Sequence, residues 1–197
     1  MAEYSATMVS QSFWFSEFKQ YIDLVNDGQT VAEIREKVVD QNTFQQSTVA
    51  RAQDMFNTVK RRVATLDSDY LELFVTLDVG SQKLVNLISI MKLDQLFDEF
   101  MYEVYRDELV LGDSQLHDYE VEAFFSRKQA ENAQIATWTN ETIERLIRIF
   151  KTFPREAGLM SDRGNYDQVK RPLLNLSLES LLQGKHEHRI LAVLLGR

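Results

Sequence analysis

The sequence predicts an all-α, multi-helix protein with a helix-turn-helix-like N-terminal part followed by a helical bundle. Its 197 residues include only seven Gly and two Pro, so it has little of the turn chemistry that a many-stranded β protein needs. Apolar residues recur at spacings of three and four along most of the chain, which is the period of an amphipathic helix. A chain of this length can also bury a substantial hydrophobic core.

Capping residues and an apolar stripe mark the first two helices. A helix is predicted over 13–25, with Phe18 and Ile22 on its buried stripe and Gly28 just past its end. Thr30 followed by Glu33 predicts a capping box, in which each side chain accepts a hydrogen bond from the other residue's backbone N–H. The box begins a short second helix, which the QNTFQQ segment at 41–46 closes.

A longer third helix is predicted from Ser47, a good N-cap residue, to about Leu66. Its apolar stripe consists of Val49, Ala52, Phe56, Val59, Val63 and Leu66. The opposite, solvent-facing side is expected to carry Ser47, Arg51, Asp54, Thr58, Arg61 and Arg62. A short capped helix, a turn and a helix with Arg near its start suit a helix-turn-helix, whose second helix reads the major groove of DNA.

The helical pattern weakens between Asp67 and Gly80, where we predict a domain boundary that divides the chain into residues 1–78 and 79–197. Six helices are predicted beyond it, over 82–92, 94–109, 119–132, 139–156, 178–182 and 187–195. Thr139 or Asn140 is expected to cap the longest of them. These helices would form the C-terminal bundle.

Composition excludes several classes of function. The chain has no Cys, which excludes disulfides, thiolate nucleophiles and cysteine zinc sites and allows a reducing compartment. No secretory signal pattern is visible at the N-terminus, and the apolar runs are shorter than the roughly 20 residues that span a bilayer. We therefore expect a cytoplasmic protein without contact with membranes.

No motif for catalysis or for a cofactor is present. The phosphate-binding loops G-x-x-x-x-G-K-[ST] and G-x-G-x-x-G and the nucleophile elbow G-x-S-x-G do not occur. His186 and His188 are two residues apart, so on a helix they would point in different directions. We therefore predict no enzymatic activity, no cofactor and no metal.

Acidic residues gather in the middle of the chain. The net charge is −8, and residues 67–132 hold 5 Lys and Arg against 15 Asp and Glu. One predicted helix carries Asp94, Asp98, Glu99, Glu103, Asp107 and Glu108. Their spacing is typical of the solvated outer face of an amphipathic helix. The alternative is an acidic surface that docks a basic partner.

Basic residues form two clusters. The first is Arg51, Lys60, Arg61 and Arg62 on the third helix, where Asp54 counts against DNA binding and an ordinary solvated face is the alternative. The second is Arg145, Arg148, Lys151 and Arg155, whose spacing could follow a phosphate backbone. The candidate DNA-binding residues are Ser47, Thr48, Arg51, Lys60, Arg61, Arg62, Arg145, Arg148 and Lys151.

The whole chain, from about Tyr4 to Leu182, resembles the BrxA family of BREX (bacteriophage exclusion) phage-defence systems. The segments that carry the resemblance are YSATMVSQSFWFSEF, LVNDGQTVAEIREKVVDQNTFQ, KRRVATLD, LVNLISIMKLDQLFDEFMYEVYRDELVLGD, FFSRKQAENAQIATWTNETIERL and FPREAGL, in this order. The resemblance implies a small, all-helical, NusB-like cytoplasmic protein, encoded beside a methyltransferase and other defence proteins. It also implies the absence of catalytic activity and the ability to bind double-stranded DNA.

Two hypotheses on function follow. In the first, the chain is a non-enzymatic defence component that binds double-stranded DNA mainly through phosphate contacts. In the second, it is a scaffold that docks another BREX protein through the acidic middle region. The sequence leaves open whether the chain also forms a homo-oligomer.

Overall fold

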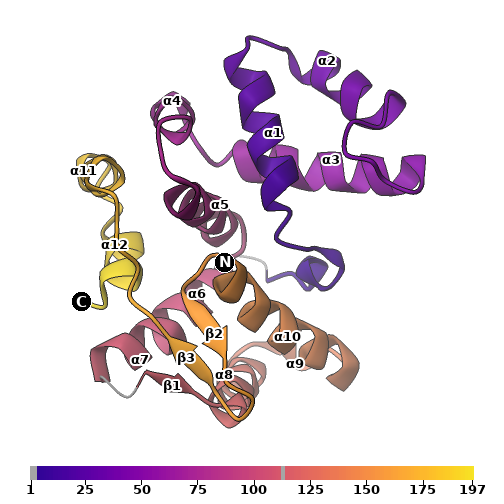
Figure 1. Cartoon of the computed structure of the whole chain (residues 1–197). Coiled ribbons are helices and arrows are strands. Elements are labelled where there is room, and N and C mark those ends of the chain that lie inside the picture. Colours follow the sequence, from indigo (N-terminus) through magenta and orange to yellow (C-terminus); the bar gives the residue numbers. More distant parts are fainter. Residues whose placement is uncertain (1–3, 112–113) are drawn as a thin grey trace.

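The computed structural model describes residues 4–111 and 114–197, and most of these residues are helical (Figure 1). This confirms the predicted all-α class. The first half of the chain contains the short 3-10 helix η1 (Thr7–Ser10), α1 (Phe15–Asn26), α2 (Val31–Arg35), the π-helical turn η2 (Glu36–Asp40), α3 (Val49–Val63), α4 (Ser68–Phe74) and α5 (Val79–Leu93).

The second half begins with α6 (Gln95–Phe100), the π-helical turn η3 (Met101–Tyr105) and α7 (Arg106–Leu111), which follow one another without a break where one helix is predicted over 94–109. It continues with α8 (Asp118–Glu131), α9 (Ala133–Ala136), α10 (Asn140–Glu156), α11 (Leu176–Gly184) and α12 (His188–Leu195). An antiparallel sheet in the order β1-β3-β2 was not predicted; its strands are β1 (Gln115–Leu116), β2 (Met160–Asp162) and β3 (Asp167–Val169). Strands of two or three residues are too short to show the alternation that marks a strand in sequence.

The capping signals of the N-terminal helices are confirmed. Gly28 follows α1 with a positive φ of 81°, a conformation that glycine adopts without strain. The Thr30 hydroxyl accepts a hydrogen bond from the Glu33 backbone N–H at 3.3 Å, and the Glu33 carboxylate accepts one from the Thr30 backbone N–H at 2.7 Å. The capping box thus sets the start of α2.

The start of α3 differs by one residue from the prediction. Thr48, not Ser47, is the N-cap, and its hydroxyl accepts a hydrogen bond from the Arg51 backbone N–H at 3.2 Å. Val49, which was expected on the apolar stripe, is the first residue of α3 and is 68% exposed. The other five stripe residues, Ala52, Phe56, Val59, Val63 and Leu66, are buried as predicted.

An unpredicted helix, α4, occupies the region where the helical pattern weakens. Asp67 caps it by accepting a hydrogen bond from the Tyr70 backbone N–H, and Tyr70 and Phe74 are buried. Buried apolar residues from Met8 to Leu194 belong to one hydrophobic cluster. The division into residues 1–78 and 79–197 stays a prediction.

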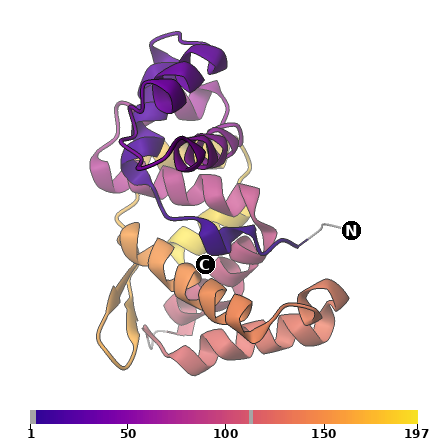
Figure 2. The ribbon, with the colours of Figure 1, turned by 90° about the vertical axis from the view of Figure 1, so that its right-hand side faces the viewer.

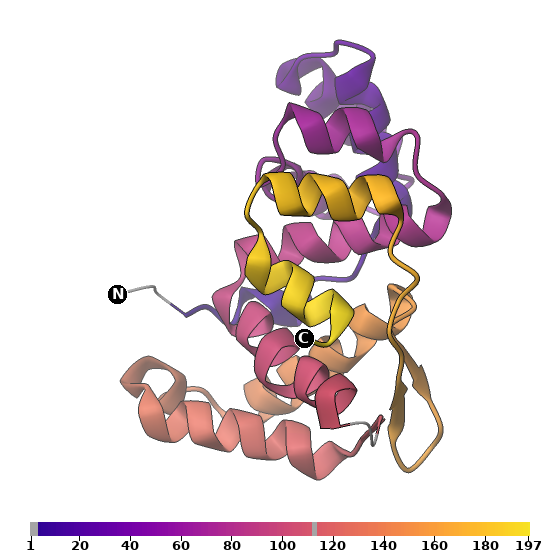
Figure 3. The same cartoon turned by 90° about the vertical axis from the view of Figure 1, so that its left-hand side faces the viewer.

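The two ends of the chain cover opposite sides of the molecule. Figure 2 shows the N-terminal segment, here residues 4–14, passing between α3 and α10. Figure 3, from the other side, shows α11 beside α4 and α5, while α12 reaches η3 and α7. Part of α3 is therefore covered by a segment that lies more than 30 residues away in sequence.

Candidate nucleic-acid interface

The N-terminal segment divides the polar face of α3 into a covered part and an exposed part. Thr58 and Arg62 were expected to face solvent, but the structure buries both. An open groove of about 550 Å³ runs along the boundary, lined by Thr7, Ser10, Gln11, Trp14, Asp54, Asn57, Thr58 and Arg61.

The guanidinium of Arg62 is fully buried and holds the N-terminal segment in place. It donates hydrogen bonds to the backbone carbonyl oxygens of Phe13 at 2.7 Å and Ser12 at 2.9 Å, and to the Gln11 side chain at 3.2 Å. Burial and the neighbouring charge of Arg61 lower the pKa of Arg62 to about 9, which leaves it protonated at neutral pH. The prediction that Arg62 lies on the solvent face is wrong, because its partners come from a segment about 50 residues earlier.

The other three basic residues of α3 remain accessible. Arg51 and Arg61 are exposed, and Lys60 is half-buried, with its ammonium 5.5 Å from the centre of the Phe56 ring. Arg51 donates a hydrogen bond to the Ser47 hydroxyl at 3.2 Å. Within residues 4–111 and 114–197, none of the four basic residues of α3 has a carboxylate oxygen within 4.0 Å.

On α10, by contrast, carboxylates neutralise most of the basic cluster. Asp167 of β3 is fully buried and accepts from Lys151 at 2.9 Å and from Arg155 at 2.8 Å. Lys151 also pairs with Asp118, and Arg155 with Asp162 at 3.3 Å. The side chain of Lys151 is only 13% exposed. Lys151, a candidate DNA-binding residue, is therefore largely covered and paired, because the sheet and the start of α8 pack against this side of the helix.

The remaining basic residues of α10 lie on its outer face among acidic ones. Arg145 is exposed and pairs with Glu141 at 2.6 Å. Arg148 is exposed, and its guanidinium donates a long hydrogen bond of 3.4 Å to the backbone oxygen of Glu144. The outer face of α10 thus carries charges of both signs.

The acidic helix is not the solvated face that its spacing predicts. Asp98 pairs with Arg189 of α12 at 2.5 Å, and Lys128 of α8 pairs with both Glu99 at 2.7 Å and Glu103 at 2.9 Å. Of the six acidic residues from Asp94 to Glu108, Asp107 is the one classed as exposed. The interpretation as an outer face fails because α8 and α12 pack against this helix and bring the opposite charges with them.

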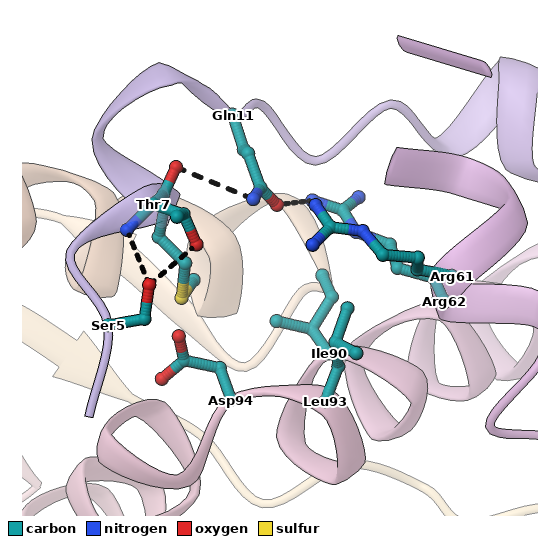
Figure 4. A pocket seen from close by; sticks show the side chains of 9 residues that line it. Ser5, Thr7, Gln11, Arg61, Arg62, Ile90, Leu93 and Asp94 are labelled. Carbon is teal, nitrogen blue, oxygen red and sulfur yellow. Dashed lines mark hydrogen bonds between the residues drawn. The ribbon is translucent and has the colours of Figure 1, made fainter. Parts of the chain in front are cut away.

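A small cavity of about 160 Å³ lies where the N-terminal segment crosses the end of α3 (Figure 4). Its lining residues are Ser5, Thr7, Met8, Gln11, Arg61, Arg62, Ile90, Leu93 and Asp94. The Asp94 carboxylate caps α6 by accepting from the Phe97 backbone N–H at 2.9 Å. Burial raises the pKa of Asp94 to about 6. Asp94 has no ion pair within the described part of the chain, so the cavity holds unpaired groups of both signs.

The described residues contain neither a candidate metal site nor a candidate membrane-spanning helix. Within 4–111 and 114–197, no group of three or more His, Asp or Glu side chains is arranged to hold a metal ion. None of the helices in these ranges combines the length and the apolar character that crossing a membrane requires.

Comparison with known proteins identifies the family. Residues 2–186 match the model of the BrxA family. The chain belongs to the BrxA family. A relative described as "BREX protein BrxA", from Bacillus cereus (strain H3081.97), is 31% identical over 193 residues, which cover 98% of this chain and 96% of the relative. The resemblance predicted from the sequence is thereby confirmed.

The fold of this BrxA-family chain is also found in a solved structure. The crystal structure of an uncharacterised protein from Magnetospirillum magneticum superimposes with a TM-score of 0.83 and covers all of both chains. The two sequences are 16% identical, so this similarity concerns the fold alone.

Sequence reasoning missed the contribution of the N-terminal segment to the candidate site of this BrxA-family chain. Thr7 and Gln11 line both the groove and the cavity beside Arg61. These residues are uncharged, so the charge pattern that singled out α3 could not include them. The run of small polar residues between Tyr4 and Phe13 is the one signal that could have pointed to them.

Proposed function

We propose that this chain is a non-enzymatic component of a BREX phage-defence system and that it binds double-stranded DNA mainly through phosphate contacts of α3. Membership of the BrxA family and the name of the Bacillus cereus relative support the role in BREX. Other BREX proteins are the expected partners.

The observation that carries DNA binding is the set of unpaired basic residues on α3. The chain has a net charge of −8, yet Arg51, Lys60 and Arg61 stand without a carboxylate partner in the described residues. A phosphate that approaches Arg51 or Arg61 therefore displaces no internal ion pair. Contacts of Arg and Lys with phosphate supply affinity and position but little sequence information.

The order of α2, a connection and α3 supports placing the start of α3 against DNA. Ser47, Thr48 and Arg51 lie together at the N-terminal end of α3, where the helix dipole favours a negative group. The connection spans residues 41–48, from the end of η2 at Asp40 to the start of α3 at Val49. It is longer than the turn of about three or four residues in a helix-turn-helix. We therefore propose a helix-turn-helix-like arrangement with an extended turn.

The test is fluorescence anisotropy of a labelled duplex at increasing salt. Three phosphate contacts, from Arg51, Lys60 and Arg61, predict a slope of log K against log salt of about −2.7. The double variant Arg51→Gln and Arg61→Gln should flatten the slope to about −0.9. Arg163→Gln is the matched control, because Arg163 is exposed on the β2–β3 hairpin and lacks an ion pair among the described residues. A double variant with unchanged affinity and slope would rule out α3 as the interface.

The alternative, docking of a BREX partner through the acidic middle region, has less support. Asp98, Glu99 and Glu103 are already paired with Arg189, Lys128 and Arg127. A basic partner would have to compete with these internal pairs. Exposed acidic residues such as Glu72 and Glu122, which have no ion pair among the described residues, would be left to attract it.

A further inference from the structure

The cavity between the N-terminal segment and α3 has an electrostatic environment that is unusual for this acidic chain. Arg61 and Arg62 contribute two positive charges to its lining, and neither has a carboxylate within 4.0 Å among the described residues. The hydrogen-bond acceptors of Arg62 are all neutral, and its buried Nε has no partner. A buried guanidinium usually has a negative partner because desolvation of an uncompensated charge is costly.

The cavity also offers neutral hydrogen-bond donors. Ser5, Thr7 and Gln11 line the same space as Arg61. The Thr7 hydroxyl accepts a hydrogen bond from the Ser5 hydroxyl at 3.1 Å, and the Gln11 amide donates to the Thr7 backbone oxygen at 3.4 Å. Hydroxyl groups can rotate to donate to a new acceptor. The volume of about 160 Å³ is roughly ten times the space that one water molecule needs, so a small anion fits.

We infer that this cavity binds a phosphate group. Arg61 and the hydroxyls of Ser5 and Thr7 contact the phosphate directly, and the buried guanidinium of Arg62 contributes positive charge from farther away. The inference goes beyond DNA binding by the exposed end of α3. The phosphate group could belong to a free phosphate or to the backbone of a bound duplex.

Asp94 opposes the bound anion. Figure 4 shows its carboxylate across the cavity from the two guanidinium groups. The titratable groups that line the cavity are Arg61, Arg62 and Asp94; the residues from η1 and α5 that line it carry no charge. Glu99 acts on Asp94, and Glu156 on Arg62, from outside the lining. Because the pKa of Asp94 is raised, its negative charge is lost in mild acid, and the cavity then becomes more positive.

The test is calorimetric titration of the full chain with inorganic phosphate at neutral pH in dilute chloride buffer. Arg61→Gln should lower the affinity about tenfold, the effect of one charge-assisted hydrogen bond. Asp94→Asn removes the opposing charge but keeps a good N-cap for α6, and it should raise the affinity about fivefold. Arg163→Gln, remote on the β2–β3 hairpin, should change nothing.

Three results would overturn the inference: no phosphate binding by the parent chain, unchanged affinity in Arg61→Gln, or weaker binding in Asp94→Asn. Circular dichroism of each variant checks that the helices are intact. Thr7→Val provides a second variant that leaves all charges in place, and it should weaken phosphate binding without changing the net charge.

A competition experiment identifies the source of the phosphate group. If phosphate displaces the labelled duplex more strongly than chloride at equal ionic strength, a backbone phosphate occupies the cavity; if the two salts act equally, the site binds free phosphate. If the chain binds DNA but not phosphate, only this inference is refuted. If it binds phosphate but not DNA, only the proposed function is refuted.

Discussion

Helices α3 and α10 each carry four basic residues, but the two sets differ in whether carboxylates lie beside them. On α10, three of the four lie within 4.0 Å of a carboxylate: Arg145, Lys151 and Arg155. On α3, none does in the described part of the chain, even though one of the four is fully buried. The number and spacing of basic residues therefore do not decide whether a helix can bind an anion. The acidic groups that neighbouring elements bring to the helix decide it.

The largest expected effect is a difference in unfolding free energy between variants of Arg61 and Arg62, two neighbouring residues of α3. Arg62→Ala leaves the carbonyl oxygens of Ser12 and Phe13 without their donor, and each lost buried hydrogen bond costs about 1–3 kcal/mol. We expect the free energy of unfolding to fall by about 3 kcal/mol in Arg62→Ala, but by less than about 0.5 kcal/mol in the exposed Arg61→Ala. Urea denaturation of both variants measures this difference. Equal stabilities would show that Arg62 does not hold the N-terminal segment.

The next effect tests the neutralisation of α10. Asp167→Asn removes the buried carboxylate that Lys151 and Arg155 share. Because these two side chains are partly exposed, we expect a loss of about 2 kcal/mol in unfolding free energy, less than for a fully buried pair. Lys151 and Arg155 would also gain freedom to contact DNA, so affinity for a duplex should rise at low salt. If the variant binds DNA no better than the parent, the ion pairs with Asp167 are not what keeps Lys151 and Arg155 from contacting DNA.

DNA binding should itself distinguish the two helices. Arg51→Gln is expected to weaken duplex binding about tenfold, the equivalent of about 1.4 kcal/mol, because it removes one unpaired contact. Arg148→Gln, on the outer face of α10, should change the affinity less than twofold, because Glu141 and Glu144 keep that face close to neutral. Anisotropy titrations at one salt concentration suffice. The reverse order of effects would move the interface to α10.

The last effect has the opposite sign and concerns Asp94, a partly buried carboxylate that, unlike Asp167, has no ion pair among the described residues. Its pKa is raised to about 6 in the folded chain, against about 3.9 when unfolded. The folded state therefore binds the proton more tightly, and stability falls as pH rises from about 4 to about 6. Asp94→Asn should stabilise the chain by about 1–2 kcal/mol at neutral pH, and the gain should vanish below about pH 4. A gain that does not depend on pH would contradict this origin.

The sequence by itself determined the local features of the protein. The helical period predicted α1, α3, α8 and α10 close to their observed bounds, because apolar spacing depends only on residues one or two turns apart. The Thr30–Glu33 capping box was likewise predicted from two residues three apart. The N-cap of α10 was predicted as Thr139 or Asn140, and the structure shows Thr139. The resemblance to the BrxA family rested on the order of segments along the chain, which is also a property of sequence.

Only the tertiary structure decided which charged groups are available. Arg62 is buried because Ser12 and Phe13 cross α3, and Lys151 is neutralised because β3 carries Asp167 to it. The hydrogen bonds of Arg62 to these two residues join positions 50 and 49 apart. A helical wheel contains no information on such partners, since it describes one helix in isolation. Packing of distant segments sets the local desolvation and charge, and these two quantities determine whether a basic residue supports the fold or remains free to bind an anion.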